Sequence, residues 1–151
     1  MSKIDTLHPK IKDEVRKLVD HINLNILKSN VHMIVTQGLR TFEEQNKLFN
    51  QKPKVTNAKG GQSLHNYGLA FDFCLAEGGK TIWDTAKDFD GDKVPDWMEI
   101  VKVFKDAGYT WGGDFRSIKD APHFEKTFGH TWQDLLAIKN EGKTQNGYVT
   151  I

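Results

Sequence analysis

Residues 63–72 read Ser-Leu-His-Asn-Tyr-Gly-Leu-Ala-Phe-Asp, and their pattern constrains both the local backbone and the candidate site. The alternation of apolar side chains over residues 69–73 predicts a strand, with Asp72 on the face opposite the phenylalanines. His65 and Asp72 are seven residues apart, an odd spacing that places them on opposite faces of a flat strand. We therefore expect the chain to bend between them, at residues 66–68, where Gly68 favours a turn.

A second segment, residues 120–123, reads Asp-Ala-Pro-His and adds another imidazole. Pro122 disfavours helix at the residue before it, so we expect Asp120 and His123 on an extended turn. Two imidazoles and one carboxylate, from His65, His123 and Asp72, form the ligand set of a catalytic zinc that keeps its fourth position open. Asp72 also lies between two phenylalanines, where a carboxylate needs a partner. The pattern predicts a zinc site.

Two further residues suit metal-assisted hydrolysis at this site. Zinc makes water nucleophilic near neutral pH, and Asp120 would take up a proton and return it to a leaving group. Arg40 is always charged, and its planar fork suits an oxyanion. A surface arginine at a helix start is the alternative, but the helix dipole disfavours a cation there, which favours a functional role.

Three more residues are weaker candidates for binding a substrate. Gln37 and Ser63 would line a substrate groove or simply close a turn. Trp111, beside two glycines, would lie partly in the core or along the cleft.

Composition limits the classes of protein to consider. The 151 residues are expected to form one domain, 1–151, and carry 21 basic and 20 acidic residues, for a net charge of +1. Since no basic stripe alternates with aromatic residues, we expect no nucleic-acid partner. The N-terminus lacks the apolar core of a signal peptide, and no apolar run suits a membrane span. We expect synthesis in the cytoplasm without a signal peptide, no membrane insertion and a monomer.

Periodicity and capping residues predict an α+β domain with a small antiparallel sheet flanked by helices. Thr41 and Glu44 form the sequence signature of a helix start. The segments between elements are a loop over residues 51–62, a long acidic excursion over 76–95 and a polar tail from Glu141. The expected helices cover residues 9–28, a segment from Thr41, 96–107 and 131–140, and the expected strands cover 31–36, 69–73, 109–111 and 123–124.

The acidic excursion contains a second candidate ion site, in which carboxylates occupy positions 1, 3, 5, 9 and 12 of a loop. This spacing is typical of EF-hand-type calcium loops. Lys93 replaces the usual glycine at position 6 and Gly91 stands at position 4, so the loop geometry must differ. The alternative is a solvated acidic turn at the start of a helix. The candidate calcium ligands are Asp88, Asp90, Asp92, Asp96 and Glu99.

The metal set as a whole resembles the zinc D,D-/L,D-peptidases of peptidoglycan. This group includes the D-Ala-D-Ala dipeptidases and carboxypeptidases of vancomycin resistance and the phage L-alanyl-D-glutamate endopeptidases. Residues 63–72 are similar to their signature S-x-H-x-x-G-x-A-x-D, and residues 36–41 with Gln45 resemble their G-x-R-[ST]-x-x-x-Q element. Residues 55–62 and 111–114 resemble the L-alanyl-D-glutamate branch, although that branch often has tryptophan where this chain has Phe115.

The resemblance implies a fold, a reaction and residue roles. It implies the Hedgehog/DD-peptidase-like fold, a zinc held by His65, Asp72 and His123, Asp120 as acid/base, and Arg40 as the cation that steadies the substrate carbonyl. The substrate would be bacterial peptidoglycan, cleaved between L-Ala and D-Glu by an enzyme of the phage endolysin type that acts on the wall after release.

Two other functions stay open at this point. One is a D-Ala-D-Ala carboxypeptidase of the same superfamily. The other is a non-catalytic, zinc-stabilised cell-wall binding module, which would need neither Asp120 nor Arg40.

Overall fold

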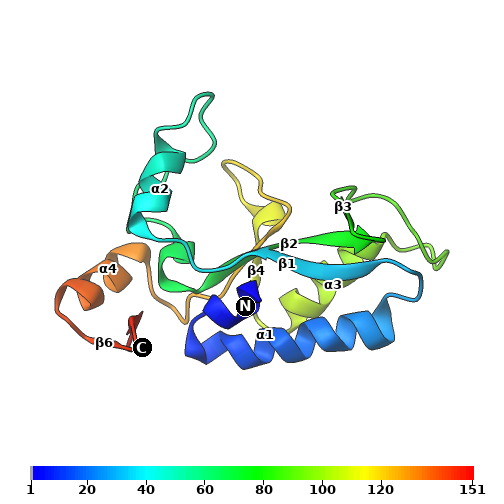
Figure 1. Ribbon diagram of the computed structural model, residues 1–151, viewed down its shortest axis with the longest axis horizontal. Coiled ribbons are helices and arrows are strands. Elements are labelled where there is room, and N and C mark those ends of the chain that lie inside the picture. Colours follow the sequence, from blue (N-terminus) through cyan, green and yellow to red (C-terminus); the bar gives the residue numbers. More distant parts are fainter. Residues whose placement is uncertain (1) are drawn as a thin grey trace.

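A five-stranded antiparallel sheet organises residues 2–151, the part of the chain that this computed structural model describes (Figure 1). Strands β1, β2, β5 and β4 are neighbours in that order, and β3 pairs with β2. The strands are β1 (His32–Gln37), β2 (Ala70–Glu77), β3 (Lys80–Ile82), β4 (Thr110–Trp111) and β5 (His123–Glu125), and a separate hairpin joins β6 (Thr144–Gln145) to β7 (Tyr148–Val149).

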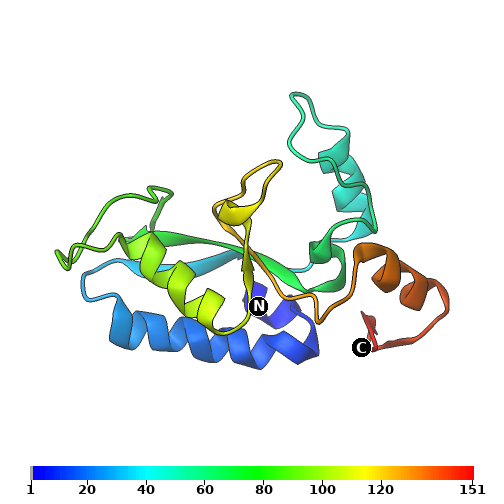
Figure 2. The same ribbon diagram turned by 180° about the vertical axis from the view of Figure 1, so that it is seen from behind.

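The helices are not spread evenly around this sheet. The α-helices are α1 (Pro9–His21), α2 (Phe42–Phe49), α3 (Asp96–Asp106) and α4 (Trp132–Asn140). Both α1 and α3 lie along the same side of the sheet, while α2 projects from one end of the molecule (Figures 1 and 2). Shorter helical turns are η1 (Lys3–Thr6), η3 (Leu64–Tyr67) and η4 (Gly112–Asp114), all of 3-10 type, and the π-helical turn η2 (Ile22–Ile26).

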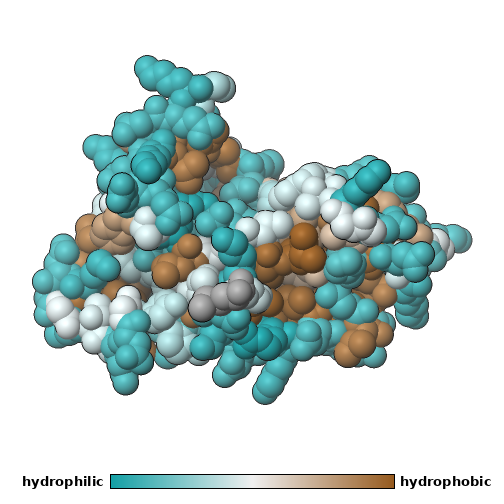
Figure 3. All heavy atoms as spheres, in the orientation of Figure 1, coloured by the Kyte–Doolittle hydropathy of each residue, from teal (hydrophilic) through white to brown (hydrophobic). Residues whose placement is uncertain are grey.

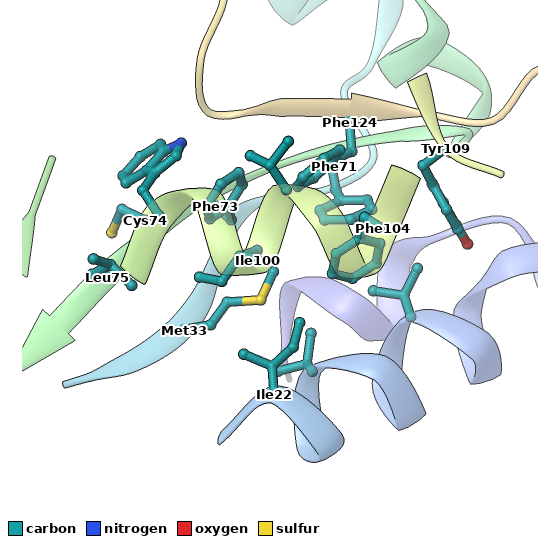
Figure 4. Packing of buried hydrophobic residues seen from close by; sticks show 14 of the residues in the cluster. Ile22, Met33, Phe71, Phe73, Cys74, Leu75, Ile100, Phe104, Tyr109 and Phe124 are labelled. Atoms are coloured by element: carbon teal, nitrogen blue, oxygen red, sulfur yellow. The ribbon is translucent and has the colours of Figure 1, made fainter. Parts of the chain in front are cut away.

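The main core lies between the sheet and the helices α1 and α3 (Figure 4). Its centre is a stack of aromatic rings, in which Phe124 of β5 stacks on Phe73 of β2 and on Phe104 of α3, at centroid distances of 5.1 and 4.9 Å. Phe71 and Trp97 are also fully buried. Each such ring removes a large apolar area from water, so this stack fixes β2 against α3.

Strand β2 positions the candidate metal ligands because it pairs with β1 and β5 on its two sides. Asp72 lies opposite His123 of β5 and opposite Gln37 of β1. The register with β1 shifts between Val35 and Gln37, which is a β-bulge. Asp72 is half-buried, whereas its strand neighbours Phe71 and Phe73 are fully buried.

The predicted α+β architecture is confirmed, with differences in detail. The expected helix over residues 9–28 is α1 followed by the π-helical turn η2, and the capping box at Thr41 and Glu44 is present at the start of α2. The sequence patterns did not indicate β3 within the excursion or the hairpin of β6 and β7 in the tail. None of the helices among residues 2–151 combines the length and apolarity that crossing a membrane requires.

Candidate metal centre

The chain bends between His65 and Asp72, as predicted. Ser63 caps the 3-10 helix η3 and Asn66 completes the capping box. Gly68 ends the helix at a φ of +70°, and a Cβ atom there would lie 2.7 Å from the backbone nitrogen of His8. Glycine is therefore required at this position on both conformational and steric grounds. The turn brings the His65 ring to the same side of the sheet as Asp72.

Each imidazole is held by a hydrogen bond on the nitrogen that points away from Asp72. Nδ1 of His65 donates to the carbonyl of Gly38 at 2.9 Å, which leaves Nε2 facing Oδ1 of Asp72 at 3.3 Å. Nε2 of His123 donates to Oε1 of Glu125 at 2.7 Å, which leaves Nδ1 3.4 Å from the same Asp72 oxygen. Such partners fix the tautomer and orientation of histidine ligands.

The two separations from Oδ1 of Asp72 fit a tetrahedral metal, and all three donor atoms lie within 4.8 Å of one another. Ligand atoms at about 2.0–2.1 Å from a tetrahedral zinc lie roughly 3.3 Å apart. Oδ1 of Asp72 is buried and has no hydrogen-bond partner among residues 2–151, and such an oxygen is costly unless a cation or a donor meets it. The nitrogen and oxygen donors therefore fit zinc.

The electrostatic environment also favours a cation. Burial alone would raise the pKa of Asp72, but the imidazoles of His123 and His65 outweigh it and hold the pKa well below its usual range. Burial would lower the pKa of His123, but the carboxylates of Asp72 and Glu125 reverse this and raise it to about 9. The carboxylates thus stabilise positive charge at this point.

Asp120 lies beside the ligand set on the turn before β5. Its Oδ2 is 3.8 Å from Nδ1 of His123, and its side chain is about half exposed, at 49%. Burial and the charge of Asp72 raise the pKa of Asp120, against the opposing effects of His123, His65 and Arg40. A carboxyl group with a raised pKa is suited to proton transfer near neutral pH.

Gly112 packs directly against the turn that carries Asp120. Its carbonyl accepts a hydrogen bond from the backbone nitrogen of Asp120 at 2.9 Å. A Cβ atom on Gly112 would lie 2.2 Å from the carbonyl oxygen of Asp120 and 2.9 Å from Cβ of His123. The close approach explains the glycine, since any side chain here would displace the turn.

Arg40 reaches the site from the segment between β1 and α2. Its Nη1 donates to Oε1 of the buried Gln45 at 2.9 Å, and Nε2 of Gln45 donates to the carbonyl of Ala58 at 2.9 Å. Burial lowers the pKa of Arg40, although the carboxylates of Asp72, Glu44 and Asp120 oppose this shift. Arginine nevertheless stays protonated in proteins, so the guanidinium brings a fixed positive charge.

These groups line one hollow, which we call the metal cleft. It runs between the side formed by α2 with residues 51–62 and the segment that follows η4, and Figure 3 shows the surface notched beside the projection that carries α2. The charged and polar residues that line it are Arg40, Thr56, Gln62, Ser63, His65, Asp72, Asp120, His123 and Glu125. An adjoining hollow continues past Phe115 to Ile118 and Trp132.

The structure therefore brings together most of the predicted site residues. Ser63 lines the metal cleft, while Gln37 lies in a neighbouring hollow that Arg40 also lines. Trp111 is not among the residues that line the metal cleft, and its Nε1 donates to the carbonyl of Ala121 at 2.7 Å. The five candidate calcium ligands belong to a separate group.

Sequence reasoning missed the two groups that orient the imidazoles. Glu125 could have been found, since it follows His123 by two residues in a strand and so shares its face. The carbonyl of Gly38 carried no sequence signal, because a backbone acceptor is defined only by the tertiary contact.

Comparisons with known proteins give this arrangement a family. The chain is 39% identical over 125 residues to the peptidoglycan L-alanyl-D-glutamate endopeptidase CwlK of Bacillus subtilis, an alignment that covers 79% of this chain and 72% of that protein. Residues 56–126 match a peptidase M15 family model described as D-alanyl-D-alanine carboxypeptidase. The chain belongs to the M15 peptidase family.

One further relative and one solved structure are also similar to this chain. The M15 peptidase is 27% identical over 125 residues to the L-alanyl-D-glutamate peptidase of Listeria phage A118, covering 83% of this chain but only 40% of that protein. Its fold is similar to the crystal structure of the Serratia marcescens L-Ala D-Glu endopeptidase ChiX, with a TM-score of 0.57 at 23% identity, over 83% of this chain and 84% of that one. M15 peptidases are generally zinc-dependent, and this chain has a His-Asp-His group that suits the metal.

Proposed function

We propose that this M15 peptidase hydrolyses the L-Ala–D-Glu bond of peptidoglycan stem peptides, with zinc held by His65, Asp72 and His123. The observation that carries the proposal is the convergence of three metal-ligand atoms, Asp120 and Arg40 in one cleft. The names of the Bacillus and Listeria phage relatives support the choice of bond. The phage relative also supports an endolysin-type role on the cell wall.

Within this proposal, the side chains of the cleft have separate roles in hydrolysis. Zinc in such a site supplies a Lewis acid and makes water nucleophilic near neutral pH. Asp120 accepts a proton from the attacking water as the new carbon–oxygen bond forms. It then delivers that proton to the amine of D-Glu as the carbon–nitrogen bond breaks. One proton therefore moves from water to the leaving amine, and Asp120 ends in its starting state.

Arg40 stabilises the negative charge that develops on the carbonyl oxygen of L-Ala. Its guanidinium is held by Gln45 and lines the same cleft as Asp120. A fixed donor aimed at a developing oxyanion needs no reorganisation during the reaction, which is the largest source of stabilisation in many hydrolases. Glu125 and the carbonyl of Gly38 orient the two imidazoles without contacting the substrate.

The decisive experiment is digestion of purified peptidoglycan, followed by mass spectrometry of the fragments. We expect new amino termini on D-Glu. Release of free D-Ala alone would assign a carboxypeptidase instead, and binding to the wall without any new fragment would assign a binding module.

Asp120→Asn tests the acid/base role in the same digestion. It should keep zinc and lose about 10²–10⁴-fold in turnover, the usual range for such a group. Asp114→Asn is the matched control, because Asp114 is half exposed and pairs with Lys105 rather than lining the metal cleft. If Asp120→Asn loses zinc but recovers full turnover on reconstitution, the two aspartates have exchanged roles.

A further inference from the structure

Five carboxylates gather where the acidic excursion meets the start of α3, at the end of the sheet away from α2 (Figures 1 and 2). One oxygen each from Asp88, Asp90 and Asp96 lie within 4.8 Å of one another, as do oxygens of Asp90, Asp92 and Glu99. Asp90 belongs to both groups, so the five side chains surround one region. We call these five residues the acidic cluster.

Several oxygens of the acidic cluster are buried without a partner. Asp96 is fully buried, and while its Oδ1 accepts from the backbone nitrogen of Phe89 at 3.0 Å, its Oδ2 has no hydrogen-bond partner among residues 2–151. Both carboxylate oxygens of Glu99 and Oδ2 of Asp90 are buried and unpartnered in the same sense. Leaving such oxygens dry and unpaired is strongly unfavourable unless a cation meets them.

Direct salt bridges do not neutralise these charges within the part of the chain that the structure describes. Within residues 2–151, none of the five carboxylates forms an ion pair with a lysine or arginine. Burial, together with Asp92 and the other neighbouring acids, raises the pKa of Glu99 to about 8. Burial and the charges of Asp90, Asp88 and Asp92 likewise raise the pKa of Asp96.

We infer that the acidic cluster binds one calcium ion, at a site separate from the metal cleft. Only oxygen donors are present, which selects a hard cation and excludes the nitrogen or sulfur set that zinc prefers. Oxygens bound to calcium at 2.3–2.6 Å lie at most about 5 Å apart, and the oxygens of each group of three lie within 4.8 Å of one another, which is compatible with one shared ion. Magnesium fits less well, because it demands a shorter, near-octahedral shell and keeps several waters.

The departures from the usual calcium loop are accommodated by the backbone. Lys93 occupies the position where these loops have glycine, and it adopts a φ of +73°. Its backbone nitrogen donates to Oδ2 of Asp88 at 2.7 Å, and that of Gly91 donates to Oδ1 at 2.9 Å. The loop is thus folded around its first aspartate although Lys93 carries a side chain.

The cluster is connected to the metal cleft through α3. Asp96 and Glu99 belong to the first turn of that helix, and Trp97 between them is fully buried. Its ring packs on Phe73 at 4.5 Å between centroids, and its Nε1 donates to the carbonyl of Ala121 at 3.3 Å. Ala121 lies in the turn between Asp120 and His123. Calcium would therefore stabilise the first turn of α3. That helix turn supports the turn formed by residues 120–123, which we call the catalytic turn.

The test is calorimetric titration and thermal melting of the zinc-loaded protein with calcium chloride, and with magnesium chloride as the second arm. A ligand specific for the folded state should raise Tm by about 5–10 °C when its concentration is about 100 times Kd. We expect this rise with calcium and a much smaller one with magnesium.

Glu99→Gln and Asp90→Asn should abolish the calcium-dependent rise in Tm. Without calcium, Glu99→Gln should melt at or above the parent protein, because a neutral amide relieves the repulsion. Glu77→Gln is the matched control, since Glu77 is exposed at the end of β2, and it should keep the full response. The inference would be overturned if the parent protein showed no calcium-dependent heat or change in Tm. It would also be overturned if Glu99→Gln showed the same change as the parent.

Discussion

Nε2 of His123 lies 2.7 Å from Oε1 of Glu125, a carboxylate in the same short strand. Because an ionised carboxylate only accepts hydrogen bonds, this contact places the ring proton on Nε2 and presents the lone pair of Nδ1 to Asp72. The pair therefore decides which nitrogen of His123 is available to a metal. Glu125 acts as a positioning residue within the proposed site.

Glu125→Gln should lower the affinity for zinc by about 10–100-fold, the usual cost of losing such a partner. The amide can keep the hydrogen bond but lacks the negative charge that increases the basicity of the imidazole. Competition with a fluorescent zinc chelator measures the affinity directly. Glu77→Gln, an exposed change on β2, should leave it unaltered. Equal zinc affinities for Glu125→Gln and the parent would exclude the positioning role.

Gln45 should act on catalysis through Arg40. Gln45→Met keeps the volume of a buried side chain but removes both of its hydrogen bonds, so the guanidinium loses its fixed position. We expect kcat to fall about 10-fold with little change in KM, because one charge-assisted hydrogen bond contributes about 1.5 kcal/mol or more. Arg40→Lys should also lower kcat, since an ammonium lacks the planar fork.

A double variant distinguishes this from general loosening of the structure. If Gln45 works through Arg40, then Gln45→Met should add little to the defect of Arg40→Lys, because neighbouring residues in one network are not additive. Fully additive losses in kcat would instead assign Gln45 an independent, structural role.

The sequence contained the bend between His65 and Asp72 because the constraint on this part of the ligand set is local. A seven-residue spacing from His65 to Asp72 forces a bend, and Gly68 is the residue that permits it. Helix starts were equally local, since the side chains of Thr41 and Glu44 satisfy the backbone groups of their own turn. Such features need no knowledge of the rest of the chain.

Other features depend on contacts between distant segments, and single-sequence patterns could not supply them. The carbonyl of Gly38 meets His65 only because the β-bulge in β1 and the turn at η3 bring them together. Strand β3 has only three residues, two of them exposed, so its apolar pattern is too short to predict a strand. The strands β6 and β7 are shorter still, at two residues each, and both residues of β6 are polar.

Gly112→Ala should disturb the catalytic turn more than the fold. The added methyl group would overlap the carbonyl of Asp120 and approach His123, so the turn must shift. Overpacking of this kind costs about 1–3 kcal/mol. We expect a fall in zinc affinity and a larger fall in kcat, measured beside Thr110→Ala, an exposed change in the neighbouring strand. Normal turnover by Gly112→Ala would show that the turn tolerates displacement.

A pH-dependent contribution to stability should come from His8, at the start of α1. His8 is buried, its Nδ1 accepts from the backbone nitrogen of Lys10 at 3.0 Å, and its Nε2 donates to the carbonyl of Val149 at 2.7 Å. The bond from Lys10 needs the neutral ring, because a protonated ring could not accept it, whereas the bond to Val149 can form in either protonation state. Burial lowers the pKa of His8 below 6.5, aided by the charge of Lys10 and opposed by the bond to Val149.

The sign of the effect follows from this lowered pKa. Between the folded and unfolded pKa values the unfolded chain binds more protons, so the free energy of unfolding falls as the pH drops below about 6.5. His8→Asn keeps a good helix cap but has no titrating ring. In urea unfolding at pH 7.5, 6.5 and 5.5, with zinc chelated in both proteins, the parent should lose more stability than His8→Asn on acidification. Parallel losses in the two proteins would show that protonation of His8 is not coupled to unfolding.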